Sequence, residues 1–214
     1  MRRNMAEKAT AERIILGIDP GTNVMGYAVL RCPLLQTRKG VVEPLTIGAL
    51  KMKKTESHYL RLKQIRDKVM ELISEFLPDE MAIESPFFGI NVTSVVKLCR
   101  AQGAAMTAAL DRDIPIHEYP PARVKIAITG NGRASKEQVS AMVRSILHFE
   151  EQQDVPLDAT DALAIALCHY YETSKGLPDG AFGHGAKKSH SKGGSAGSSW
   201  EKFVEANKNR VHKQ

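Results

Sequence analysis

The sequence predicts an α/β protein in which helices flank a mixed sheet. Short apolar strands bounded by turn residues alternate with amphipathic helices in the order β-β-β-α-β-α-β-α-α. Short links join the first three strands, and this favours an antiparallel meander. A chain of 214 residues, 43% of them hydrophobic, can bury a core without disulfides or a structural metal.

The first half of the chain supplies four of the five expected strands and two helices. Turn signals and apolar runs predict strands at 13–19, 25–30, 46–50 and 81–84. Apolar residues at helical spacing predict a helix over 62–76 that Pro78 stops, and a second over 91–110. The second helix is rich in small residues, which either form a seam with another subunit or pack within one subunit.

The second half continues with a short fifth strand at 114–119 and the two final helices of this order, with a further short helix before them. A short helix is expected over 122–129 and is followed by a glycine turn. Ser135 and Gln138 have the spacing of a capping box, so the next helix starts there. The last helix is expected over 157–173.

Composition separates two terminal segments from the folded domain expected over 12–174. Residues 1–11 are polar, contain a second Met at position 5 and are expected to be a disordered extension. Residues 175–214 are expected to be a flexible basic tail, since 176–199 holds 7 Gly and 5 Ser in 24 residues. A largely disordered tail is the main expectation; a capping-box pattern offers the alternative of a short helix at 199–208, containing Trp200, that docks on a partner or on the parent domain.

Charge and cysteine content narrow the classes of protein to which this sequence can belong. The formal net charge is +6, of which residues 175–214 carry +5 and residues 1–174 carry +1. Most of the excess therefore lies on the tail, where it favours salt-sensitive, non-specific contact with a polyanionic partner. Cys32, Cys99 and Cys168 are odd in number and show no C-x-x-C spacing, so we expect a reducing, cytoplasmic location. The apolar stretches are too short for a membrane span or a signal peptide.

Four carboxylates fall where a strand ends or a helix begins. Asp19 ends the first strand, Glu84 ends the fourth, and Asp158 and Asp161 share one face of the last helix. Singly, an Asp at such a position favours a turn or a helix start. Together at one crevice they would repel each other unless a cation were bound, and Mg²⁺ prefers such oxygen ligands. Two Mg²⁺ ions could then support hydrolysis of a phosphodiester.

These residues resemble the ordered acidic motifs of the RuvC family of bacterial Holliday-junction resolvases. The motifs are Gly17-Ile-Asp-Pro-Gly-Thr22 with Gly26-Tyr27, Ala82-Ile-Glu84, and Asp158-Ala-Thr-Asp-Ala-Leu-Ala164. The resemblance covers about residues 13–172. It implies a ribonuclease H-like nuclease domain and a homodimer that makes paired, Mg²⁺-dependent nicks in strands of like polarity at a four-way DNA junction.

The resemblance also implies a site and partners. Asp19, Glu84, Asp158 and Asp161 would be the metal ligands, with Mn²⁺ expected to substitute for Mg²⁺. The branch-migration proteins RuvA and RuvB would be partners in recombination and DNA repair.

Three basic residues are candidates for DNA contact. Lys136 lies in the first turn of a helix, where the dipole disfavours a cation by up to ~1 kcal/mol, so it is either a phosphate-binding residue or a solvated surface residue. The family resemblance also implies that Lys136, and Lys125 in the preceding segment, support catalysis. Arg133 lies in the glycine turn and could contact the DNA backbone.

Two adjacent aromatic residues follow the second acidic motif. Phe87 and Phe88 lie in a Pro/Gly loop, where two rings are hard to bury together. An exposed ring stacks on unpaired bases at ~1–3 kcal/mol per base. The competing interpretation is that one or both rings close the core, and for Phe88 the two interpretations remain open.

Two other functions share parts of this pattern. An ATP-dependent phosphotransferase or ATPase of the actin/sugar-kinase type also has an Asp-x-Gly-Thr turn after its first strand, but it needs a second lobe for which this chain has no room after Thr173. A non-catalytic junction-binding protein could keep the fold. Such a binder has no reason to gather four acids next to phosphate, so the sequence favours the nuclease.

Overall fold

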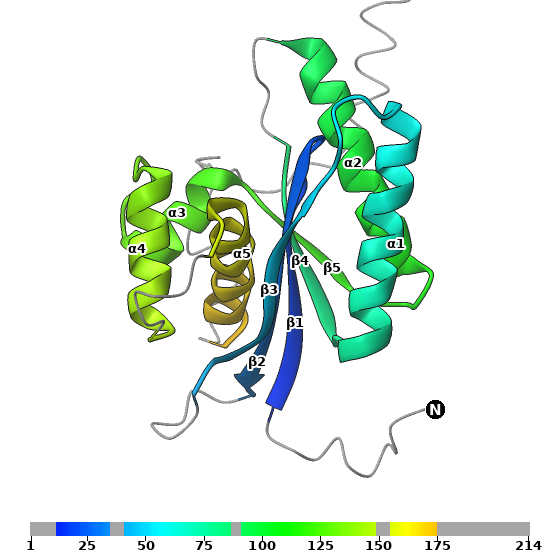
Figure 1. Ribbon diagram of the computed structural model, residues 1–214. Coiled ribbons are helices and arrows are strands. Elements are labelled where there is room, and N and C mark those ends of the chain that lie inside the picture. Colours follow the sequence, from blue (N-terminus) through cyan, green and yellow to red (C-terminus); the bar gives the residue numbers. More distant parts are fainter. Residues whose placement is uncertain (1–11, 35–40, 87–90, 149–154, 175–214) are drawn as a thin grey trace, which may run out of the picture. The chain divides into compact units, whose positions relative to one another are not determined.

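The computed structural model describes residues 12–34, 41–86, 91–148 and 155–174 (Figure 1). The expected N-terminal extension and basic tail, including Trp200, lie outside the described residues. Phe87 and Phe88 also lie outside them.

A single five-stranded sheet has the order β3-β2-β1-β4-β5. β1 pairs antiparallel with β2, which pairs antiparallel with β3, so the predicted meander is confirmed. β1 pairs parallel with β4, and β4 pairs parallel with β5. The sheet is therefore mixed, with the parallel strands on one side of its centre. The strands are β1 (Glu12–Asp19), β2 (Val24–Pro33), β3 (Glu43–Lys51), β4 (Glu80–Glu84) and β5 (Ile116–Tyr119).

Helices cover both faces of the sheet, α1 and α2 on one face and α3, α4 and α5 on the other (Figure 1). Their order along the chain is the predicted one. None of the helices in the described part of the chain is both long and apolar enough to span a membrane. The helices are α1 (His58–Phe76), α2 (Val92–Leu110), α3 (Pro121–Thr129), α4 (Lys136–Ile146) and α5 (Leu157–Ser174).

Two hydrophobic clusters lie on the two faces of the sheet. Ile15 of β1 packs in the cluster that contains α5, while its neighbour Leu16 packs in the cluster that contains α1 and α2. This alternation follows the two-residue period of a strand, and it makes β1 a central strand buried on both faces. The small residues Ala101 and Ala105 of α2 are fully buried in the α1 cluster, so these two pack within one subunit.

Local signals determine where the helices start and stop. α1 begins earlier than the apolar spacing predicted, because the Ser57 side chain accepts a hydrogen bond from the backbone N–H of Leu60. Leu77 ends it in the left-handed conformation, with a φ of 50°, just before Pro78. The predicted capping box of Ser135 and Gln138 is confirmed at the start of α4.

Two glycines bring the backbone of α5 into contact with the sheet. A Cβ on Gly17 would lie 2.3 Å from the carbonyl oxygen of Ala162, and one on Gly26 would lie 1.9 Å from that of Asp158. Any side chain at these positions would push the helix away. The glycines therefore allow the first two turns of α5 to lie directly over β1 and β2.

Candidate active site

Asp19 and Glu84 end two adjacent parallel strands, β1 and β4. Ile18 of β1 pairs with Ile83 of β4, and each is followed directly by one of the two acidic residues. Asp19 and Glu84 therefore lie side by side at the same edge of the sheet. Both point to the α5 face, because Gly17 and Ala82, two residues earlier in each strand, contact α5 or its cluster. The strand ends thus supply the first two carboxylates.

The first two turns of α5 supply Asp158 and Asp161. One carboxylate oxygen each from Asp19, Asp158 and Asp161 lies within 4.8 Å of the other two, an arrangement that could hold a metal ion. Glu84 reaches the same place from β4, since an open cleft is lined by Asp19, Glu84 and Asp161. All four predicted acids are therefore brought together from three elements. The other residues lining the cleft are Pro121, Val124, Lys125, Lys136, Val139 and Ala164.

Lys136 points into this acidic cleft from the first turn of α4. Its Nζ donates to Oδ2 of Asp161 at 2.5 Å, and its side chain remains 58% exposed. A cation at a helix N-terminus is locally unfavourable, but the neighbouring carboxylates raise the pKa of Lys136 and offset that cost. Desolvation opposes this upward shift. A lysine at a helix start is unfavourable by local rules, and its contact with Asp161 of α5 explains why Lys136 occupies that position.

Of the other two basic residues predicted to contact DNA, one lines the cleft and one does not. Lys125 of α3 lines the cleft with the acids. Arg133 lies in the turn between α3 and α4, where its backbone N–H donates to Oδ1 of Asn131 at 3.0 Å. It is not among the described residues that line the cleft.

Burial and mutual repulsion perturb two of the acids. The pKa of Asp19 is raised to about 8, mainly by desolvation and then by the charges of Glu84 and Asp161. The pKa of Glu84 is raised to about 7, again by desolvation first and then by Asp161, against the lowering effect of Lys136 and Lys125. The site therefore gathers more negative charge than its two lysines balance. A hard divalent cation fits this set of oxygen donors.

Two supporting residues were not identified from the sequence. Gln102 of α2 is buried, and its Nε2 donates to Oε2 of Glu118 at 2.8 Å and to the carbonyl oxygen of Glu84 at 3.4 Å. Arg61 of α1 donates to the carbonyl oxygen of Thr22 at 2.8 Å, next to the turn after Asp19. The sequence offered one signal for Gln102, a polar residue among small and apolar positions of a helix, and none for Arg61. The partners of both residues are distant in sequence, so the contacts could not be predicted.

Known proteins resemble this chain over most of its length. The profile of the family described as crossover junction endodeoxyribonuclease RuvC matches residues 15–169. The RuvC of Porphyromonas gingivalis is 50% identical over 94% of this chain and 97% of its own. That of Bacteroides fragilis is 47% identical over 94% of this chain and 96% of its own.

Solved structures agree with the sequence matches. The structure of Thermus thermophilus RuvC has a TM-score of 0.66 at 33% identity, covering 74% of this chain and 95% of its own. The structure of the same protein in complex with a Holliday-junction substrate has a TM-score of 0.69 at 33% identity, covering 77% and 96%. The predicted ribonuclease H-like fold is confirmed. The chain belongs to the RuvC family of crossover junction endodeoxyribonucleases.

Proposed function

We propose that this protein resolves Holliday junctions by paired, Mg²⁺-dependent nicking of strands of like polarity. One observation carries the proposal: Asp19, Glu84 and Asp161 line a single open cleft with Lys125 and Lys136. Acids that bind metal and bases that bind phosphate are what phosphodiester hydrolysis requires. The T. thermophilus relative in complex with a Holliday-junction substrate supports this choice of DNA.

Asp19, Glu84, Asp158 and Asp161 would hold two Mg²⁺ ions. The fit rests on their shared oxygen chemistry and on the raised pKa values of Asp19 and Glu84, because burial, and after it the neighbouring carboxylates, disfavours their charged forms when no cation is bound. The ions would supply an activated water and stabilise the leaving oxygen. We expect Mn²⁺ to substitute, because it accepts the same ligands.

The lysines of the cleft act on the substrate. Lys136 is held by Asp161 yet largely exposed, so its ammonium group can approach a DNA phosphate without leaving the cleft. Lys125 contributes a second positive charge from α3. Contact of Arg133 with the DNA backbone remains a prediction. So does stacking of Phe87 or Phe88 on unpaired bases.

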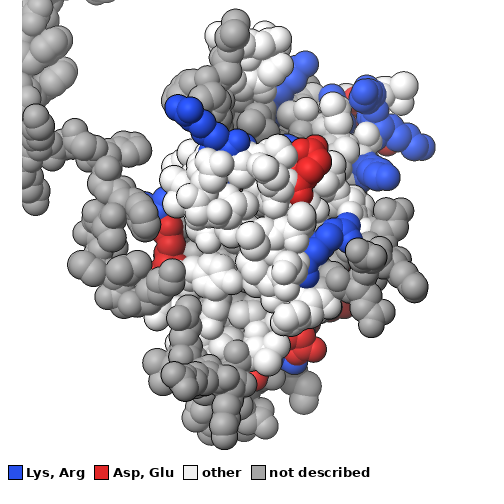
Figure 2. All heavy atoms as spheres, turned by 90° about the vertical axis from the view of Figure 1, so that its left-hand side faces the viewer, with Lys and Arg blue, Asp and Glu red and all other residues white. Residues whose placement is uncertain are grey.

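The surface charge does not by itself mark a DNA-binding face. Seen from the side on which α4 lies in Figure 1, basic and acidic side chains are scattered among uncharged ones (Figure 2). Where described atoms are visible, neither sign forms a continuous field. Affinity for DNA would therefore depend on local groups such as those of the cleft rather than on a broad charged field.

We also propose that the protein acts as a cytoplasmic homodimer. Paired nicks in a two-fold junction require two active sites, and α2 leaves Val92, Val96 and Leu110 between 42% and 72% exposed. RuvA and RuvB are the expected partners in branch migration. We propose that residues 12–174 are the nuclease domain and that the basic tail of residues 175–214 adds non-specific DNA affinity.

Cleavage of a synthetic four-way junction tests the proposed function. With Mg²⁺ we expect symmetric nicks in two strands of like polarity, and none in EDTA or on a linear duplex of the same sequence. Binding of the junction without any symmetric nicks would instead indicate a non-catalytic binding protein. The alternative of an actin/sugar-kinase type enzyme is not retained, because the family match spans residues 15–169.

Stabilisation by Mg²⁺ should increase with pH. Asp19 binds its proton more tightly in the folded metal-free protein, with a pKa of about 8 against a usual 3.8. Folded protein therefore retains a proton that unfolded protein has released, and metal-free stability falls as pH rises through this window. Mg²⁺ must displace that proton, so its binding is favoured at higher pH.

Melting temperatures with and without millimolar Mg²⁺ check this prediction. We expect the increase caused by Mg²⁺ to be larger at a pH of about 8 than at about 6. Asp19→Asn should reduce both the Mg²⁺ effect and its pH dependence, of which Glu84, with a pKa raised to about 7, keeps a part. An Mg²⁺ effect that is equal at both pH values in the wild-type protein would contradict the prediction.

A further inference from the structure

A second cluster of potential metal ligands lies away from the catalytic acids. Glu80 begins β4, His117 lies in β5 and His169 lies in α5. One ligand atom from each lies within 4.8 Å of the other two. We propose that these three residues form a second metal site, which takes a zinc-class ion rather than Mg²⁺.

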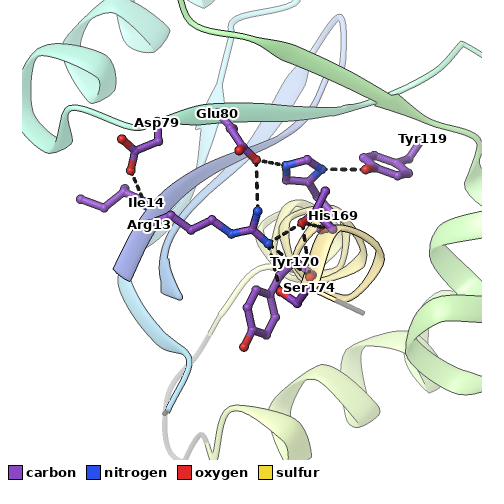
Figure 3. Close-up of polar contacts among 9 residues, drawn as sticks. Arg13, Ile14, Asp79, Glu80, Tyr119, His169, Tyr170 and Ser174 are labelled. Carbon is purple, nitrogen blue, oxygen red and sulfur yellow. Dashed lines mark hydrogen bonds and ion pairs between the residues drawn. The ribbon is translucent and has the colours of Figure 1, made fainter. Parts of the chain in front are cut away.

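The sheet register brings Glu80 and His117 to the face that α5 covers, where His169 lies. Ala82 pairs with His117 and packs in the α5 cluster. Glu80 precedes Ala82 by two residues and therefore points to that face as well. Its Oε2 contacts Nε2 of His169, which is fully buried (Figure 3). The rings of His117 and His169 lie with their centroids 4.4 Å apart.

Tyr119 provides an outer partner for His169. Its hydroxyl lies 2.6 Å from Nδ1 of His169, on the side of the ring opposite Glu80 (Figure 3). A metal-bound Nε2 would carry no proton, and a proton on Nδ1 would then be donated to the tyrosine oxygen. Such a hydrogen bond fixes the tautomer and orientation of a ligating imidazole.

Arg13 lies beside the cluster but is held mainly by α5. Its Nη1 is 3.6 Å from Oε2 of Glu80, whereas its Nη2 donates to the carbonyl oxygen of Tyr170 at 3.3 Å and to Oγ of Ser174 at 3.1 Å (Figure 3). The guanidinium can keep these contacts while Oε2 binds a metal. Its positive charge nonetheless opposes a second cation, so we expect moderate, micromolar affinity.

The donor set distinguishes this site from the catalytic one. Two imidazole nitrogens and one carboxylate match Zn²⁺ and Co²⁺, whereas Mg²⁺ prefers oxygen ligands. Glu80 precedes Glu84 by four residues in a strand, about 13 Å. His169 follows Asp161 by eight residues in a helix, about 12 Å. The two sites can therefore bind their ions independently.

Co²⁺ titration of the full-length protein tests the proposal. The background variant carries Asp161→Asn to weaken the catalytic site, and His184, His190 and His212 are replaced by Gln to remove tail ligands. We expect one equivalent of Co²⁺ with the visible absorption of a low-symmetry nitrogen and oxygen site, displaced by Zn²⁺ but not by excess Mg²⁺. Zn²⁺ should also raise the melting temperature.

Three variants assign the ligands. His117→Ala removes a partly exposed side chain, and Glu80→Gln keeps the shape of the carboxylate; each should weaken Co²⁺ binding at least ~10-fold. His148→Ala, which removes an exposed histidine elsewhere, should leave binding unchanged. Equal Co²⁺ binding in the background protein and the His117→Ala variant, or no bound equivalent, would show that the cluster is an ion-pair and hydrogen-bond network only.

Discussion

Asp161→Asn should lower the rate of junction nicking by ~100- to 1,000-fold while the protein stays folded and binds the junction. Asp161 lies within 4.8 Å of Asp19 and Asp158 and holds Lys136 at 2.5 Å, so its charge acts at the centre of the cleft. Amide replacement keeps the shape of the side chain but removes that charge and exchanges one acceptor oxygen for an NH2 group.

Stability should change in the opposite direction from activity. The charge of Asp161 raises the pKa of Asp19 and of Glu84, after the larger effect of burial. Removing it relieves repulsion among the remaining acids, so without metal the melting temperature of Asp161→Asn should equal or exceed that of wild type. Single-turnover nicking at saturating enzyme, with thermal unfolding measured in parallel, checks both parts.

Asp67→Asn is the matched control for this variant. Asp67 is an exposed acid of α1 that pairs with Lys63, away from the cleft, so its replacement should leave nicking unchanged. If Asp161→Asn nicked junctions at the wild-type rate, Asp161 would not belong to the site. If it failed to bind the junction, its role would be in binding rather than in catalysis.

Gly26→Ala should destabilise the protein and abolish nicking together. The added Cβ would lie 1.9 Å from the carbonyl oxygen of Asp158 and 2.6 Å from its carbonyl carbon. Both are backbone atoms that no rotamer change can move, so the first turn of α5 must shift. Overpacking of this kind costs about 1–3 kcal/mol of the free energy of unfolding, and the shift carries Asp158 and Asp161 away from Asp19.

Gly103→Ala provides the control for the glycine effect. A Cβ on Gly103 meets no atom within 4 Å, and the residue lies inside α2. Alanine is a better helix former than glycine by about 1 kcal/mol, so this variant should be more stable and fully active. Denaturant unfolding and junction nicking should separate the two variants. Wild-type stability in Gly26→Ala would show that α5 does not lie as close to β2 as described.

The pattern of strands and helices could be predicted because it depends on local signals. Apolar spacing gave every element in the right order, and the capping box at Ser135 marked the start of α4. The start of α1 was missed, since Ser57 caps it one turn before the apolar spacing begins. Asp19 and Glu84 could be singled out from position, because each ends a strand directly after a run of apolar or small residues.

By itself, then, the sequence determined the class of fold and singled out the four acids as candidate metal ligands, since strand period, helix period and residue type are local properties. Only the tertiary structure decided what surrounds them. The pairing of Lys136 with Asp161, the support of Glu84 by Gln102 and the contact of Gly26 with Asp158 join residues far apart in the chain. Pairings between distant residues depend on how helices pack on the sheet. The raised pKa of Asp19 has the same origin, because burial and neighbouring charge exist only after the chain has folded.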